Sequence, residues 1–295
     1  MTVIETRQLA KNFTFRDVLA SVDLTIERGS VVGLLGTNGS GKSTLIKCLL
    51  GLLKANKGTS KIFGEDSWAL SAHAKARIGY VPQKPNFYPW MSAMDIVDYM
   101  GAFYETWDRD WTRELMKRWA LPTCDRAEAL SPGQKQRLSM VLALGHRPEL
   151  IVLDEPVASL DPLGRRESLR QLIEVTQDGD HTMLYSTHIL SDLERVATHV
   201  AILAGGRIIC YDELDVLKER FKRLRLSAAK NLPDSFSIPD ALQMTKSGKE
   251  AVVTLPNVSE DLIQRLKQKW DCDITIEDLN LEEIFLELSS GEGSR

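Results

Sequence analysis

Residues 36–44 carry the strongest chemical signal in this sequence. They read GTNGSGKST and fit the phosphate-binding pattern G-x-x-x-x-G-K-[ST] in full. Glycines at these spacings let backbone N–H groups curl around phosphate oxygens without clashes from Cβ atoms. Lys42 would bring positive charge to the β- and γ-phosphates of a nucleotide, and the Ser43 hydroxyl could ligate Mg²⁺. An ordinary glycine-rich turn is the alternative, but the apolar strand before the loop and the helical pattern after it favour a phosphate site.

A second group of polar residues ends the apolar stretch LIVLDEP at 150–156. Asp154 stands where such a strand would end and is placed to hold Mg²⁺ through water. Glu155 could orient or deprotonate an attacking water molecule. A strand that merely ends in an acidic turn would look the same in isolation. Beside a phosphate loop, the pair predicts chemistry on a bound nucleotide.

Two more polar residues follow predicted strands. Gln83 ends IGYVPQ and could touch both Mg²⁺ and the attacking water. His188 follows TMLYST and could donate a hydrogen bond to the γ-phosphate or to that water. A lone histidine of this kind is more often structural, so both assignments depend on the loop at 36–44.

The segment ALSPGQKQRL at 129–138 looks like the start of a helix. Ser131 would be the N-cap, and Pro132 would take the first helical position, where its missing N–H costs nothing. Gln134 could reach back to the cap in a capping box. Local rules alone do not say whether this helix start is only well capped or also points at an anion.

The elements that must position these residues alternate between strand and helix. The apolar run Val31–Leu35, followed by a glycine-rich loop and a helical pattern, is the strand–loop–helix unit of α/β folds. Further elements are expected as strands at 3–10, 18–27, 78–82, 150–155 and 182–187, helical patterns at 95–120, 132–145, 163–177 and from 189, and a hairpin turning at Gly205-Gly206. After about residue 221 a hairpin, a helix, a strand and a closing helix predict a second, small α+β domain.

Composition narrows the class of protein. A net charge of −4 over 295 residues argues against a surface devoted to nucleic acid or anionic lipid. The four cysteines are scattered without metal-ligand spacing, which favours reduced thiols in a cytosolic protein. The N-terminus shows no secretory signal, and the apolar runs are too short to span a bilayer.

Residues 1–220 resemble the ATP-binding cassette (ABC) ATPases in the order and spacing of six motifs. These motifs are GTNGSGKST, YVPQ, LSPGQ, LIVLDEP, SLD (159–161) and STH. The resemblance implies a P-loop NTPase cassette fold with an inserted helical subdomain at about 84–145 and a separate accessory or dimerisation domain at 221–295. It also implies Mg²⁺-dependent ATP hydrolysis and dimerisation on ATP. In this family the helix start at Ser131 caps the γ-phosphate of an ATP held by the other subunit.

The resemblance assigns a role to each matching position. Catalysis would fall to Glu155, His188 and Gln83, and Mg²⁺ to Ser43, Gln83 and Asp154. ATP would be bound by Phe13, Thr37, Asn38, Gly39, Ser40, Gly41, Lys42, Ser43, Thr44, Ser131, Gly133, Gln134 and Asp161. Phe13 matches the aromatic that stacks on adenine, with Phe15 a near competitor, and Asp161 matches the acid that links the two active sites of a dimer. The sequence departs from the common family pattern at three positions. Pro132 replaces the first glycine of the signature, the segment LSPGQ at 130–134, Phe13 replaces the commoner tyrosine, and Val157 replaces threonine. None of these departures removes a charged catalytic group.

Aromatic residues crowd the segment between Gln83 and the signature: Phe87, Tyr88, Trp90, Tyr99, Phe103, Tyr104, Trp107, Trp111 and Trp119. A helical core would use many of them, and an exposed remainder would suit a groove for a partner's helix. The segments FYETWDRD and NLEEIFLELSS resemble segments of the ATPase subunits of bacterial drug and antibiotic exporters. We therefore expect an exporter ATPase on the cytoplasmic face of the cell membrane, with a permease as partner and no nucleic acid. The alternative is a soluble clamp or regulator without transport.

Overall fold

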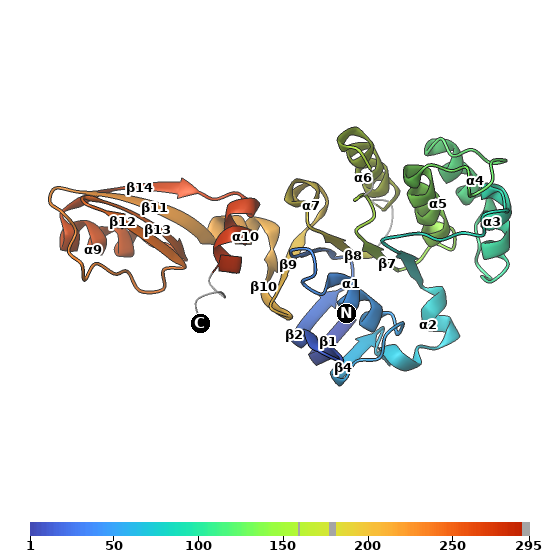
Figure 1. Ribbon diagram of the computed structural model, residues 1–295, viewed down its shortest axis with the longest axis horizontal. Coiled ribbons are helices and arrows are strands. Elements are labelled where there is room, and N and C mark those ends of the chain that lie inside the picture. The colour runs from blue at the N-terminus through green and yellow to red at the C-terminus, as the bar shows by residue number, and fades with distance from the viewer. Residues whose placement is uncertain (159, 177–180, 291–295) are drawn as a thin grey trace. The chain divides into compact units, whose positions relative to one another are not determined.

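The structure is a computed structural model that describes residues 1–158, 160–176 and 181–290. The chain divides into two compact units, Met1–Tyr211 and Asp212–Arg295 (Figure 1). Among the described residues, no helix has both the length and the apolar character needed to cross a membrane.

A mostly parallel sheet forms the centre of the first unit. Its strand order is β10-β9-β3-β8-β7-β6, and the pairs β9/β3, β3/β8, β8/β7 and β7/β6 are parallel. The strands are β3 (Val31–Leu35), β6 (Ile78–Val81), β7 (Leu150–Asp154), β8 (Thr182–Thr187), β9 (His199–Ala204) and β10 (Arg207–Glu213). All residues of β7 and β8 are buried, as expected of parallel strands covered on both faces. Because these strands run in one direction, their carboxyl ends meet along one edge of the sheet.

An antiparallel sheet of order β2-β1-β4-β5 completes the strands of this unit. It comprises β1 (Thr2–Phe13), β2 (Arg16–Glu27), β4 (Lys57–Ile62) and β5 (Glu65–Asp66), followed by the 3-10 turn η1 (Ser67–Ala69). Its buried face shares one hydrophobic core with β3 and the first helix, through residues such as Leu9, Val22, Leu34 and Ile46. The first two strands were predicted, whereas β4 and β5 were not, because KGTSKI lacks apolar alternation.

Seven helices are described in the first unit: α1 (Lys42–Leu49), α2 (Ala72–Ala76), α3 (Ala93–Gly101), α4 (Arg109–Arg118), α5 (Pro132–Leu144), α6 (Pro162–Thr176) and α7 (Leu190–Val196). The helical pattern at 95–120 is split into α3 and α4. Asp108 is the N-cap of α4 and accepts a hydrogen bond from the Trp111 N–H at 2.9 Å. Trp107 fills the break, and a Cβ at Gly101 or Gly145 would lie within 2.7 Å of its ring. The glycines therefore make room for the tryptophan.

The second unit is a four-stranded antiparallel sheet of order β12-β13-β11-β14 with helices. Its elements are α8 (Leu214–Arg220), β11 (Phe221–Ala228), β12 (Gln243–Ser247), β13 (Glu250–Pro256), α9 (Glu260–Trp270), β14 (Cys272–Asp278) and α10 (Leu281–Ser290). One face packs a core that includes Leu224, Leu226, Val253 and Leu266. The fold class expected from the sequence, a P-loop α/β cassette with a small α+β unit, is confirmed.

Candidate nucleotide site

The loop at 36–44 joins β3 to α1 and closes around the ammonium of Lys42. Lys42 Nζ donates to the backbone oxygens of Gly36 at 2.9 Å and Thr37 at 3.2 Å. The chain enters α1 through Gly41 at φ 109°, a conformation that glycine adopts at little cost. The side chain of Lys42 is only 4% exposed, so its charge is held inside the loop.

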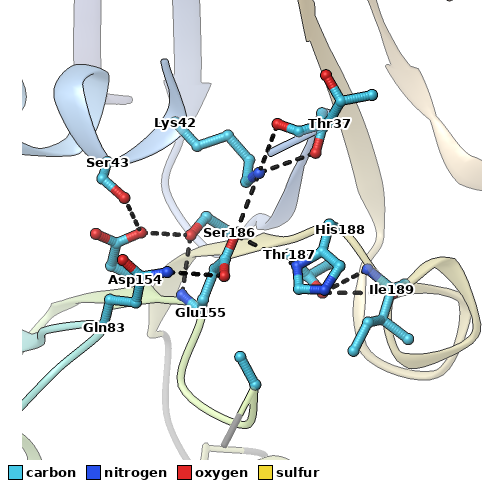
Figure 2. Close-up of polar contacts among 12 residues, drawn as sticks. Thr37, Lys42, Ser43, Gln83, Asp154, Glu155, Ser186, Thr187, His188 and Ile189 are labelled. Atoms are coloured by element: carbon cyan, nitrogen blue, oxygen red, sulfur yellow. Dashed lines mark hydrogen bonds and ion pairs between the residues drawn. The ribbon is translucent and has the colours of Figure 1, made fainter. Parts of the chain in front are cut away.

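Three side chains converge on the carboxylate of Glu155, one from the start of α1 and two from just after the strands β6 and β8 (Figure 2). Lys42 Nζ lies 3.2 Å from its Oε1, and His188 Nδ1 lies 3.4 Å from the same oxygen. Gln83 Nε2 donates to Oε2 at 3.0 Å. The structure thus brings Gln83 and His188, both expected to act in catalysis, into contact with the buried carboxylate of Glu155, the third residue of that set.

The electrostatic surroundings keep Glu155 ionised. Burial alone would raise the pKa of Glu155, but the Lys42 ammonium and the His188 ring outweigh it and hold that pKa below its ordinary value. The backbone of Glu155 has φ 48°, a region that non-glycine residues seldom occupy. Its N–H donates to Ser186 Oγ at 3.0 Å, which helps to hold the turn in this conformation.

Asp154 lies beside the loop from the neighbouring position. Its Oδ1 accepts hydrogen bonds from Ser43 Oγ at 3.0 Å and from Ser186 Oγ at 2.8 Å. Sequence reasoning missed Ser186, although it directly precedes Thr187 and His188 at the end of β8. One serine hydroxyl therefore orients Asp154 while receiving the N–H of Glu155.

A cleft of about 470 Å³ opens over these groups. It is lined by Arg16, Val18, Asn38, Gly39, Gly41, Lys42, Ser43, Thr44, Gln83, Glu155 and His188. Arg16 and Val18, both on β2, were not foreseen; Arg16 Nη2 donates to the Gly39 oxygen at 3.3 Å. Ser40 Oγ is buried behind the loop without a hydrogen-bond partner.

The aromatic candidates stand beside this cleft in the β1–β2 hairpin. Phe13 pairs in register with Arg16, which lines the cleft. The Phe13 ring is 49% exposed, and Lys11 Nζ lies 5.2 Å from its centroid. Phe15 is 98% exposed at the tip. Both rings are therefore available to a flat ligand, and Phe13 is adjacent to the lining.

The signature residues lie apart from the cleft. Ser131 Oγ accepts from the Gln134 N–H at 3.2 Å, and Gln134 Oε1 accepts from the Ser131 N–H at 2.8 Å, so α5 starts with the predicted capping box and Pro132 in its first turn. Asp161 Oδ1 accepts from the Gly164 N–H at 2.7 Å at the start of α6. None of these residues is among the described residues that line the cleft. Ser159 of the SLD segment falls outside the described residues.

The oxygen atoms near the loop suit a hard divalent cation. Ser43 and Asp154 supply a hydroxyl and a carboxylate 3.0 Å apart, and Gln83 also lines the cleft. Mg²⁺ is bound by few protein oxygens because phosphates and water fill its remaining positions. Among the described residues no cluster of three or more His, Cys, Asp or Glu side chains could hold a metal by itself.

A phosphate loop after the first strand of a parallel sheet, with an acidic pair ending a neighbouring strand, defines a nucleoside triphosphatase of the P-loop class. The family model for ABC transporters matches residues 19–158. The ABC transporter ATP-binding protein YtrB of Bacillus subtilis is 30% identical over 98% of this chain and 99% of its own. The bacitracin transport ATP-binding protein BcrA of Bacillus licheniformis is 32% identical over 75% of this chain and 73% of its own. A solved ATP-binding subunit of an ABC transporter superposes with a TM-score of 0.66 at 29% identity, over 74% of this chain and 92% of the other.

This chain belongs to the family of ABC transporter ATP-binding proteins. It is the ATP-binding and ATP-hydrolysing subunit of an ABC transporter, as predicted from the order of its motifs.

Proposed function

We propose that the residues gathered on Glu155 form the hydrolytic centre for Mg²⁺-ATP. The observation that carries the proposal is the contact of one buried, ionised carboxylate with Lys42, Gln83 and His188. An ionised carboxylate beside the γ-phosphate can orient water and accept its proton. Lys42 would neutralise the β- and γ-phosphate charge, while Gln83 and His188 hold Glu155 and the water in place.

Mg²⁺ would be held by Ser43, Asp154 and Gln83. When bound, it supplies charge that stabilises the phosphates during transfer. Ser186 would fix Asp154 through the 2.8 Å hydrogen bond, so that the carboxylate is oriented before the cation arrives. Phe13 would stack on adenine at the rim of the cleft.

The signature residues would complete this site from a second copy of the chain. Ser131, Gly133 and Gln134 start α5, and Asp161 starts α6, outside the cleft of their own chain. The N-terminus of a helix attracts anions through its free N–H groups. A dimer closed on ATP would bring this helix start to the γ-phosphate held by its partner. The second domain, predicted at 221–295, would stabilise or regulate that dimer.

A groove in the helical region would dock the permease. It has a volume of about 380 Å³ and is lined mostly by apolar residues, including Tyr80, Pro82, Phe87, Tyr99, Met100 and Leu142. Beside it, Trp90, Tyr88, Tyr99 and Phe103 form an exposed chain of ring contacts with centroid separations of 5.2–6.1 Å. Trp119 is buried and Phe87, Trp107 and Trp111 pack on the core, so the aromatic-rich segment serves both uses. Exposed rings around a groove suit the apolar face of a partner helix.

Export of a drug-like or antibiotic cargo is the transport that best fits these features. The bacitracin transport protein BcrA is among the similar proteins, and the alignment with it covers most of both chains. We place the subunit at the cytoplasmic face of the membrane, held there by the permease.

Co-purification from detergent-solubilised membranes tests this function. The wild type should bring down a protein with several apolar spans, and Tyr99→Ser with Phe103→Ser should lose it while the isolated subunit keeps its ATPase rate. Trp68→Ser is the matched control, because Trp68 is also an exposed aromatic, at 55%, but lies on η1. Absence of any membrane partner with the wild type would favour the soluble clamp.

A further inference from the structure

The signature helix α5 packs against the strand β6. The residues of α5 and its C-terminal turn that line the groove beside β6 include Ser139, Ala143 and His146. Together with Gln136 they recur at intervals of three or four residues, so they share one face of the helix. This face carries side-chain contacts to β6 at both ends and a close backbone approach in the middle.

His146 fixes one end of this pair. Its Nε2 lies 3.1 Å from the backbone oxygen of Ile78, the first residue of β6. Because a carbonyl oxygen can only accept, Nε2 carries the proton. Burial lowers the pKa of His146, so the ring is neutral and the hydrogen bond does not depend on its charge.

The middle of the pair is packed backbone to backbone. A Cβ at Gly79 would lie 2.3 Å from the Ala143 oxygen, so only glycine lets the strand approach the helix this closely. The backbones of α5 and β6 therefore lie close together at Gly79 and Ala143.

Gln136 fixes the other end. Its side chain is 1% exposed, and Nε2 donates to the backbone oxygen of Pro82 at 3.3 Å. Pro82 directly precedes Gln83, which donates to Glu155 at 3.0 Å. Proline has no N–H of its own to anchor this point of the chain.

We propose that Gln136 is a positioning residue for hydrolysis: by holding the Pro82 carbonyl, it sets the place of Gln83 against Glu155. The proposal rests on the proposed roles of Gln83 and Glu155. Under this proposal the helix α5 and the strand β6, with Gln83 directly after it, move as one rigid unit. A displacement of the signature helix, or of the groove wall that it forms, then reaches Glu155 through the buried amide of Gln136, the Pro82 carbonyl and Gln83.

Steady-state ATPase kinetics of the whole chain test the proposal. Gln136→Met keeps the length of the side chain and removes the donor, and it should lower kcat about 3- to 10-fold, the range expected for one hydrogen bond. KM for ATP should stay within about twofold, because Lys42 and its loop are untouched. Met140→Leu, one turn further along α5, is the matched control: Met140 is buried in the hydrophobic core and is not among the residues that line the groove or the cleft. Because leucine conserves the volume of methionine, this variant should leave kcat unchanged. If Gln136→Met does not fold, Gln136→Glu takes its place in the experiment, because glutamate preserves the shape of the side chain without the N–H donor.

A double-mutant cycle with Gln83→Ala separates positioning from a general loss of packing. If Gln136 acts through Gln83, adding Gln136→Met to Gln83→Ala should cost little further activity. Additive losses, or no loss with Gln136→Met alone, would overturn the proposal. An unchanged kcat in Gln83→Ala alone would instead remove Gln83 from the proposed hydrolytic centre.

Discussion

The Oε1 atom of Glu155 lies 3.2 Å from Nζ of Lys42 inside the phosphate loop. The two side chains are 7% and 4% exposed, so little solvent screens the pair. Lys42 is also the residue expected to neutralise the phosphates of the nucleotide. Glu155 and the phosphates therefore compete for one ammonium group, and this competition leads to predictions for binding as well as for hydrolysis.

Glu155→Gln should bind ADP about 3- to 10-fold more tightly than the wild type. The substitution removes a negative charge that pairs with Lys42 and repels phosphate. The repulsion acts across the open cleft, where unit charges roughly 4 Å apart in water interact by about 1 kcal/mol. Isothermal titration calorimetry with ADP measures this without hydrolysis. Lys42→Ala is the opposite control and should weaken ADP binding. If Glu155→Gln bound ADP with equal or weaker affinity than the wild type, Glu155 and the phosphates would not compete for Lys42.

The same variant should hydrolyse ATP at least about 100-fold more slowly, because a group that orients water and accepts its proton contributes that much. The amide keeps the size of the side chain and can still contact Lys42 and Gln83, so the loss reports the missing base. Phosphate release under saturating ATP gives kcat directly. Near-normal turnover would remove Glu155 from the role of base.

The ion pair also makes folding stability depend on pH. The pKa of Glu155 is lower in the folded protein than its ordinary value, so its charge contributes stability that is present above about pH 4.3, the ordinary glutamate pKa, and is lost as pH falls through the lowered pKa. The free energy of unfolding of the wild type should thus fall, relative to that of Glu155→Gln, as the solution is acidified. Urea unfolding at pH 7, 5 and 4 measures the difference. A difference that stays constant with pH would mean that Glu155 does not titrate with the lowered pKa.

Residues whose geometry is fixed by a local motif were found from the sequence. Lys42 and Ser43 follow from the spacing of the loop, and Glu155 meets Gln83 and His188 because parallel strands end at one edge. Ser186 was missed because a serine that ends a buried strand carries no distinctive spacing, and Arg16 because it reaches the cleft through a register that only the folded β1–β2 hairpin defines.

The second unit shows a different limit. Its central strand β11 was not predicted, although Leu224 and Leu226 alternate with Arg223 and Arg225 as in a half-buried strand. The structure shows that the basic residues pair with acids: Lys222 with Asp278, Arg225 with Glu277 and Arg223 with Glu283. These partners lie more than fifty residues away along the chain, so no local pattern indicates them.

The helix start at Ser131 provides the last prediction, which is that it acts on a nucleotide bound by another subunit. The described residues that line the cleft come from β2, the loop, Gln83, Glu155 and His188, and none comes from 131–134. In Glu155→Gln protein, ATP should therefore produce a stable dimer, measured by light scattering. Adding Gly133→Asp should abolish it, because a carboxylate would sit where the helix N-terminus meets phosphate.

Gly133→Ala separates charge from bulk in that experiment. A Cβ at this position would lie 2.7 Å from Leu160 Cδ2, the far end of a flexible side chain, so alanine should weaken the dimer far less than aspartate does. Pro132→Gly should also be mild, since proline has no N–H to lose and only the rigidity of the helix start declines.

The deciding measurement is nucleotide affinity at protein concentrations where the chain is monomeric. Gly133→Asp should leave that affinity unchanged, because Lys42 and its loop bind the phosphates alone in the monomer. A large loss of monomer affinity would mean that the signature contacts the nucleotide of its own chain, and the shared-site dimer would then be wrong.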